Sequence, residues 1–168
     1  MDLKPLSSIR VTAREIPEWE RIPNSSIHAK PLLIYHQAFD ASADELSAHL
    51  NEIGEVSPSW VHTMYSETHF HSTTHEVLGV VSGSARLCLG GEDNPHRFEP
   101  DVEKGDLIIV PAGVGHRLLM ETNGPFKMVG AYPKGKSWDM CYGRAEEEDE
   151  VRQNIEELGW FKRDPLYG

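Results

Sequence analysis

The chain has 168 residues, a length that fits one domain able to bury a core. It carries 16 Lys and Arg against 27 Asp and Glu, and the formal net charge of -11 repels phosphate backbones, which argues against a nucleic-acid partner. Two cysteines, Cys88 and Cys141, are too few for a disulfide framework and fit a reducing compartment. Because no window approaches the ~18 apolar residues of a membrane span, and no signal peptide is visible at the N-terminus, we expect a cytoplasmic protein without a membrane partner.

The first thirty residues contain several prolines but no sustained hydrophobic periodicity. This pattern predicts an N-terminal arm over residues 1–30 that lies extended on the domain and leads into the apolar run PLLIYHQAF, a candidate strand. Residues 31–168 are expected to form a single domain. Since such an arm can cross to a neighbour and cover a sheet edge, we expect a homodimer.

A first helix is expected over residues 42–53. Leu46 and Leu50 lie on one helical face, and Ser42 with Glu45 has the spacing of a capping box. The glycine that follows is typical of a helix C-terminus.

A second helix is expected over residues 145–158, where Val151 and Ile155 form an apolar stripe and Gly159 follows. Its acidic first turn suits the positive end of the helix dipole and is interpreted as a solvated helix start.

The segment between these helices is rich in β-forming residues. Short apolar runs alternate with turn residues over about residues 59–133, which predicts a mainly β core built as an antiparallel sandwich or barrel. The expected strands are WVHTMY, EVLGVV, ARLCLGG, HRFEP, DLIIVPAG, HRLLME and FKMVGAYP.

The stretch HFHSTTHE contains most of the groups able to bind a metal. Side chains alternate faces along a strand, so His69 and His71 point the same way while Phe70 points the other way. Glu76 opens the next strand and can turn its carboxylate toward the same pocket. His116 begins a later strand, after the turn PAGVG, and only a closed sheet would bring it near the other three.

These two stretches together resemble the paired signature of the cupin superfamily. The first matches H-x-H, four residues, Glu, six residues, Gly, and the second matches Gly, five residues, Pro-x-Gly, two residues, His. The resemblance implies a double-stranded β-helix (jelly-roll) barrel, and the two expected helices place a short helix before it and a helix after it. It also implies that His69, His71, Glu76 and His116 hold one divalent metal ion.

Two positions depart from the fuller cupin pattern: Thr63 stands where a glycine is usual, and Met120 where an asparagine often closes the second motif. Neither is a ligand. From about Pro31 to the end, the chain is similar to the small single-domain cupins called YjlB-like, through THEVLGVVSGSARLCLGG, PAGVGH, GAYPKG and DPLYG. That group implies the fold and the metal site but no particular reaction.

Three imidazoles and one carboxylate suit Fe(II), Mn(II), Ni(II), Co(II) or Zn(II), and the sequence does not distinguish these ions. A metal held by four protein groups can bind a small oxygenated substrate, which supports dioxygenase, isomerase or decarboxylase chemistry. We therefore expect a metal-dependent enzyme acting on a small molecule. The alternative is a non-catalytic cupin that binds or senses a small ligand, and a storage or scaffolding role is a third interpretation.

Other residues near the motifs have weaker interpretations. His75 is adjacent to Glu76 and is expected to face away from the pocket. Arg117 and Tyr132 are candidate contacts to a ligand, although each, taken alone, is interpreted as a structural residue. Trp60 and Trp138 are interpreted as apolar anchors. The remaining apolar residues are interpreted as core or pocket wall: Met64, Phe70, Leu87, Leu89 and Met128.

Overall fold

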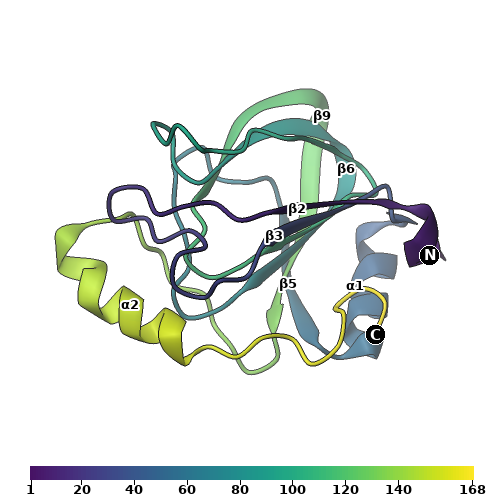
Figure 1. Cartoon of the computed structure of the whole chain (residues 1–168). Coiled ribbons are helices and arrows are strands. Elements are labelled where there is room, and N and C mark those ends of the chain that lie inside the picture. The colour runs from purple at the N-terminus through teal and green to yellow at the C-terminus, as the bar shows by residue number, and fades with distance from the viewer.

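The computed structural model describes all 168 residues, and a curved seven-stranded antiparallel sheet forms its centre (Figure 1). The strands run in the order β2-β3-β8-β6-β9-β5, β7 pairs with β6, and β1 with β4 forms a separate ribbon. The strands are β1 (Asp2–Leu3), β2 (Arg10–Arg14), β3 (Leu32–His36), β4 (Phe39–Asp40), β5 (Val56–His62), β6 (Glu76–Leu89), β7 (Asp101–Glu103), β8 (Leu107–Val110) and β9 (His116–Pro133). The helices are α1 (Ala43–Ile53) and α2 (Glu148–Glu157), with short 3-10 helices at Leu6–Ser8 and Ala145–Glu147.

Two long strands, β6 and β9, form the main pairing of the sheet, from Val77 opposite Ala131 to Leu89 opposite His116. Four expected strands form parts of these two: EVLGVV and most of ARLCLGG lie in β6, and HRLLME and FKMVGAYP lie in β9. The residues between them, which were expected to form turns, cause only shifts in the register of the continuous β6–β9 pairing. The expected strand HRFEP is wrong: only Phe98 makes a bridge there, and β7 begins at Asp101.

Both expected helices are confirmed, and they lie on opposite sides of the barrel (Figure 1). At the start of α1, Ser42 accepts from the Glu45 backbone while the Glu45 carboxylate accepts from the Ser42 backbone. Gly54 ends the helix in the left-handed region, with φ 82°. At the other helix, the 3-10 turn Ala145–Glu147 precedes α2, and Leu158 rather than Gly159 is the C-cap.

The first thirty residues are tied to the body of the same chain. β2 pairs with β3 and β1 pairs with β4, while Ile16 is buried in the core. At the other end, Leu166 is fully buried, and His49 of α1 donates a hydrogen bond to its carbonyl oxygen (2.7 Å). Both termini therefore close over the α1 side of the molecule, as the Tyr167 hydroxyl bonded to the Lys4 carbonyl also indicates.

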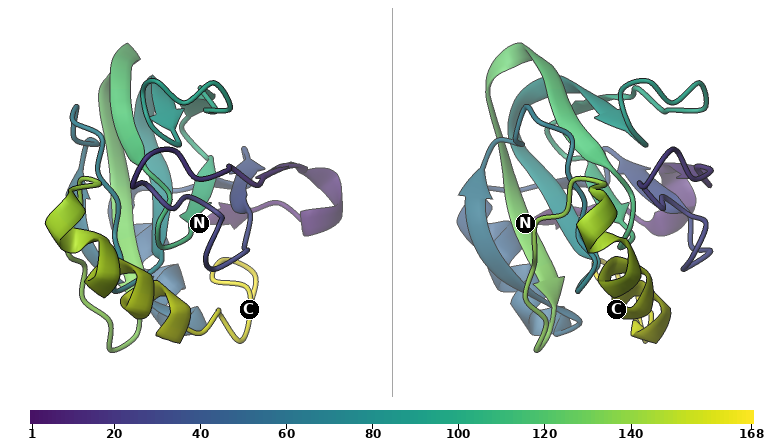
Figure 2. Two further views of the ribbon diagram at one scale, coloured as in Figure 1. Left: turned by 60° about the vertical axis from the view of Figure 1, so that its left-hand side comes forward. Right: turned by 90° about the vertical axis from the view of Figure 1, so that its left-hand side faces the viewer.

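The strand alternation separates two faces of the sheet. Val77, Ile109 and Val129 pack toward Leu46 and Leu50 of α1 in one core cluster. The neighbouring residues of the same strands face the barrel interior in a second cluster that includes Leu78, Ile108 and Met128. Glu76 has the same parity as Leu78, so β6 directs its carboxylate into the barrel. Figure 2 shows the barrel from two further sides, with α2 lying against its outside. No helix is long and apolar enough to span a membrane.

Candidate metal centre

Three histidines from two distant segments meet inside the barrel. His69 and His116 form an isolated antiparallel bridge, and His71 follows two residues later on the same side as His69. Phe70 points the other way and packs with Val151 and Ile155 of α2, as the strand alternation predicts. One nitrogen of each histidine lies within 4.8 Å of the corresponding nitrogen of the other two.

Backbone carbonyls fix the tautomer of all three imidazoles. A carbonyl oxygen can only accept, so each ring, when it is neutral, carries its hydrogen on Nδ1 and presents the lone pair of Nε2 to the centre. This is the form of histidine that binds a metal ion. The acceptors are the carbonyl oxygens of Glu67 for His69 (2.9 Å), Asp139 for His71 (2.5 Å) and Val114 for His116 (2.9 Å).

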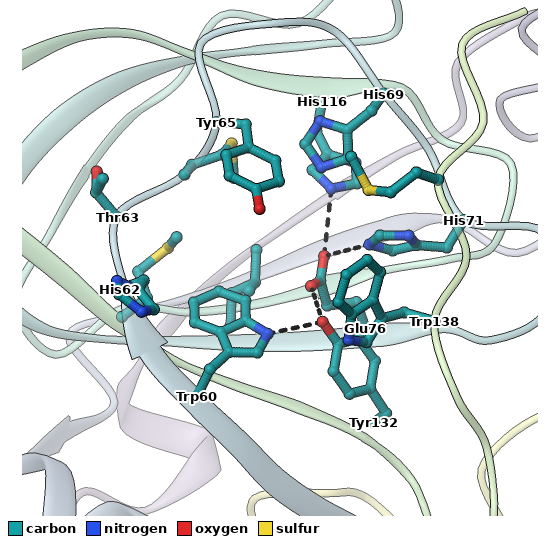
Figure 3. A pocket seen from close by; sticks show the side chains of 14 residues that line it. Trp60, His62, Thr63, Tyr65, His69, His71, Glu76, His116, Tyr132 and Trp138 are labelled. Carbon is teal, nitrogen blue, oxygen red and sulfur yellow. Dashed lines mark hydrogen bonds and ion pairs between the residues drawn. The ribbon is translucent and has the colours of Figure 1, made fainter.

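Glu76, the first residue of β6, completes the cluster. Its Oε2 lies 3.2 Å from Nε2 of His116 and 3.5 Å from Nε2 of His71 (Figure 3). Its Oε1 accepts a hydrogen bond from the Tyr132 hydroxyl (3.0 Å), which in turn accepts one from Nε1 of Trp60 (2.7 Å). The carboxylate is thus held in one orientation, with one oxygen facing the imidazoles.

The electrostatics of this buried cluster favour a carboxylate beside imidazoles. Burial raises the pKa of Glu76, but the hydrogen bonds and charges of His116 and His71 outweigh it, so the carboxyl pKa lies well below its usual range. Burial lowers the pKa of His71, yet its pairing with Glu76 leaves it raised overall. Burial and then the charge of His116 lower the pKa of His69 to about 4, so this ring is neutral near pH 7.

The donor set fits a divalent cation. With every Nδ1 committed to a carbonyl, Nε2 of each ring and Oε2 of Glu76 face one another, so these four atoms are left without a hydrogen-bond donor unless a ring takes up a second proton. Buried acceptors left without a donor are costly. A metal ion between them would satisfy all four, and the mixed nitrogen and oxygen set suits the first-row transition metals.

The cluster forms the floor of a cavity of about 320 Å³. Two aromatic residues at its mouth are exposed: Tyr65 at 62 % and Trp138 at 46 %. Trp138 lies near His71 and Tyr65 near His69, with ring centroids 6.2 and 5.5 Å apart respectively. The lining residues are Trp60, His62, Thr63, Met64, Tyr65, His69, His71, Glu76, Leu78, His116, Met128, Tyr132, Trp138 and Met140.

Trp60 reaches the cavity because its neighbour on β9 is a glycine. A Cβ at Gly130 would lie 2.1 Å from Cε2 of Trp60, so the indole ring rests directly on the backbone of β9. Trp60 is therefore a pocket residue and a support for Tyr132, not merely an apolar anchor, and Trp138 likewise lines the cavity.

His75 and Arg117 are placed away from the cavity. Nδ1 of His75 accepts from the Ala112 backbone (2.9 Å) and Nε2 donates to the Gly159 carbonyl (2.7 Å), so both ring nitrogens are used structurally. Arg117 donates to the Ser66 carbonyl and pairs with Glu92. Of His75, Arg117 and Tyr132, only Tyr132 contacts the centre, through its hydrogen bond to Glu76.

Sequence reasoning did not identify His62, Tyr65 and Met140 as pocket residues. Tyr65 follows the end of β5, and Met140 lies in the long loop before α2, so no motif spacing links either to the histidines. An aromatic residue close to the H-x-H segment is the signal in the sequence that could have identified Tyr65.

The loop that carries Trp138 is fastened to the histidine segment. The Asp139 carboxylate accepts hydrogen bonds from the backbone and hydroxyl of Ser72 and from Thr73, while its carbonyl accepts from His71. Asn154 of α2 donates to the Ser72 hydroxyl (3.1 Å). Burial raises the pKa of Asp139, but these hydrogen bonds outweigh the effect of burial and leave the pKa lowered. The Asp139 carboxylate is therefore ionised at neutral pH.

The chain is similar in sequence to proteins of one family. The Cupin domain family model matches residues 60–132. Protein YjlB of Bacillus subtilis is 32 % identical over 152 residues, which cover 90 % of this chain and 87 % of that protein. Acireductone dioxygenase 1 of Coprinopsis cinerea is 28 % identical over 97 residues, 58 % of this chain, and the chain spans 53 % of that enzyme.

A solved structure of a mutant of Bacillus subtilis oxalate decarboxylase OxdC is 18 % identical, with a TM-score of 0.39 over 67 % of this chain and 27 % of that one. The family assignment rests on the similarity to YjlB over nearly the whole of both chains, together with the domain match across the barrel strands. The chain belongs to the cupin family.

Proposed function

We propose that the protein is a metal-dependent enzyme of the dioxygenase type that acts on a small oxygenated organic molecule. His69, His71, Glu76 and His116 would hold the ion. The observation that carries this proposal is the convergence of four buried acceptors at the floor of a cavity large enough for a small molecule. A bound transition metal supplies Lewis acidity and, where it is redox-active, an electron for dioxygen chemistry.

The chain's own residues prepare the site for that chemistry. Three carbonyls hold the imidazoles in one tautomer, and Tyr132, supported by Trp60, orients Glu76. Burial and the charge of Glu76 raise the pKa of Tyr132, so its hydroxyl keeps its proton and acts as a donor at neutral pH. Apolar walls above the floor limit the water that reaches a bound substrate.

The comparisons favour dioxygenase chemistry over the isomerase and decarboxylase alternatives. Several relatives carry the name acireductone dioxygenase, although the chain spans only 53 % of the Coprinopsis enzyme and 45 % of the rice enzyme. These relatives support the reaction type. The particular substrate depends on the shape and chemistry of the cavity.

The first test is the metal content of the protein, purified without chelator and without a metal-binding tag. Plasma mass spectrometry should find about one transition metal per chain, and His71→Ala and His116→Ala should lose it. His96→Ala, at an exposed histidine outside the cavity, is the matched control and should keep it. No metal after reconstitution, or full metal in both ligand variants, would contradict the proposal.

The second test separates an enzyme from a binding protein. Loaded with Fe(II), the protein should consume dioxygen in the presence of enediol or catechol compounds, at a rate that His71→Ala abolishes. The alternative function, a cupin that binds or senses a small ligand, predicts saturable binding without consumption of either dioxygen or ligand.

We propose further that the protein is a cytoplasmic homodimer. Both cysteines are free, which suits a reducing compartment, and β2 and β5 leave unpaired edges at the two ends of the sheet. Light scattering at micromolar concentration should give twice the mass of the chain. A stable monomer would contradict the dimer without affecting the metal site.

A further inference from the structure

We infer that the cavity takes a planar, uncharged, conjugated molecule that bears hydroxyl or keto oxygens, and that it discriminates against molecules with a carboxylate or phosphate of their own. This inference rests on the proposed function, since the oxygens of the ligand would face the metal-binding floor. It follows from two independent features of the cavity, its charges and its aromatic mouth.

The cavity offers no positive side chain to a second anionic group. None of its fourteen lining residues is Lys or Arg. Arg117, the cation nearest to the histidines along the chain, turns away to the Ser66 carbonyl and Glu92. A carboxylate or phosphate placed above the floor would lose its water without gaining a counter-charge, which is strongly unfavourable. The net charge of -11 adds to the repulsion of anions.

The floor itself can balance only little negative charge. Of the four side chains that would hold a divalent ion, only Glu76 is a carboxylate, so an ion bound there would keep a single net positive charge. That charge suits a neutral molecule, or one that loses a single proton from a hydroxyl on binding. A dianion such as oxalate would exceed it, and the remaining charge would lie against apolar side chains.

The mouth presents rings that a flat molecule would cover. Tyr65 is 62 % exposed and Trp138 is 46 % exposed although both line the cavity, and they flank the floor on the His69 and His71 sides. Large exposed aromatic rings beside a concave site are typical of ligand contacts. In Figure 3, Trp138 lies beside Glu76 and His71, and Tyr65 lies apart from it, toward His69 and His116.

The rest of the wall suits an apolar, flat ligand better than a sugar-like one. Met64, Met128 and Met140 contribute thioethers, which adapt to flat surfaces. Thr63 and His62 at the rim are the main polar side chains outside the floor and Tyr132. A polyol would leave most of its hydroxyl groups without partners there.

The test compares two probes that differ in one group. The protein, loaded with redox-inert Zn(II), is titrated with 4-methylcatechol and with 3,4-dihydroxybenzoate, and binding is measured by calorimetry and by tryptophan fluorescence, to which Trp60 and Trp138 in the cavity contribute. Both probes present the same ring and hydroxyls, but only the second adds a carboxylate. We expect 4-methylcatechol to bind at least roughly tenfold more tightly than 3,4-dihydroxybenzoate. Equal or tighter binding of the benzoate, or of oxalate, would overturn the inference.

Variants test the two features separately. The substitutions Trp138→Ala and Tyr65→Ala should each lower the affinity for 4-methylcatechol roughly three- to tenfold. Trp138→Phe should change this affinity less than about twofold. Met140→Lys supplies the missing cation and should shift the preference toward the benzoate. Met120→Ala, at an exposed residue outside the cavity, is the control. Unchanged affinity in both alanine variants would refute the role of the mouth.

Metal analysis of the same samples distinguishes the two proposals. Absence of Zn(II) from the wild-type protein would count against the metal site and hence the proposed function. One Zn(II) per chain with the expected selectivity missing would overturn only the substrate class.

Discussion

His69 and His116 are hydrogen-bonded to each other through their backbones in both directions, at 3.2 and 2.9 Å. This bridge joins two segments that lie far apart in the sequence, and it sets both imidazoles on one side of the barrel wall, with ring centroids 4.3 Å apart. The centre is therefore built on main-chain pairing, which holds its geometry more rigidly than mobile side chains would.

Metal binding should stabilise the fold. Because the four acceptors converge only in the folded chain, an ion at a thousandfold excess over its Kd would add about 4 kcal/mol to the free energy of unfolding. Thermal denaturation with and without Zn(II) measures this shift, and a chelator should reverse it. The stability of His116→Ala should not respond to the metal. A metal-dependent shift of equal size in that variant would place the ion elsewhere.

The substitution Tyr132→Phe should lower the affinity for the metal ion without abolishing its binding. The phenol orients Glu76 through the 3.0 Å hydrogen bond, and loss of such a partner typically lowers metal affinity roughly 10- to 100-fold. Competition with a chromogenic chelator gives the affinity. Tyr65→Phe is the matched control, since Tyr65 lines the same cavity but no hydrogen bond joins its hydroxyl to Glu76. Equal losses in both variants would argue against a positioning role for Tyr132.

Gly130→Ala should disturb the cavity through Trp60. The new methyl group would lie 2.1 Å from Cε2 of the indole, and such overpacking costs about 1–3 kcal/mol. Urea unfolding measures the loss, and tryptophan fluorescence reports the moved ring. Gly159→Ala is the control, since nothing lies within 4 Å of a Cβ there. If the clash is the cause, Trp60→Ala should lower the free energy of unfolding less in the Gly130→Ala background than in the wild-type protein.

Cys141 should resist alkylation in the folded protein. Burial, and then the hydrogen bond to Asp139, raise the pKa of its thiol to about 12, so at pH 8 only roughly one thiol in 10,000 is ionised. Mass spectrometry after iodoacetamide treatment should find Cys141 unmodified until urea unfolds the chain. The raised pKa also means that its contribution to stability is complete below the unfolded pKa and is lost as the pH rises toward 12. Rapid labelling at pH 8 without unfolding would contradict this environment.

Local signals in the sequence predicted the parts of the molecule that depend on local chemistry. The capping box of α1 and the opposite facing of Phe70 and His71 follow from periodicities of a few residues, and the structure has both. The position of His75 outside the cavity follows from the same alternation, because it is next to Glu76.

Features that depend on tertiary pairing were not predictable in the same way. The turn-like residues inside β6 and β9 become register shifts because each strand is held by its partner along its length. Trp60 enters the cavity because Gly130, on a distant strand, leaves room for it. The role of Trp138 depends on a loop after the last strand, whose position no spacing rule gives.

Asp139 gives that loop a double influence. Its main-chain carbonyl sets the tautomer of His71 at the floor, while the residue before it, Trp138, narrows the entrance. The access of ligands to the cavity and the basicity of Nε2 of His71 therefore both depend on this one loop. Exchanging this loop between related proteins would alter substrate preference and metal affinity in a single step, with no change to the barrel strands.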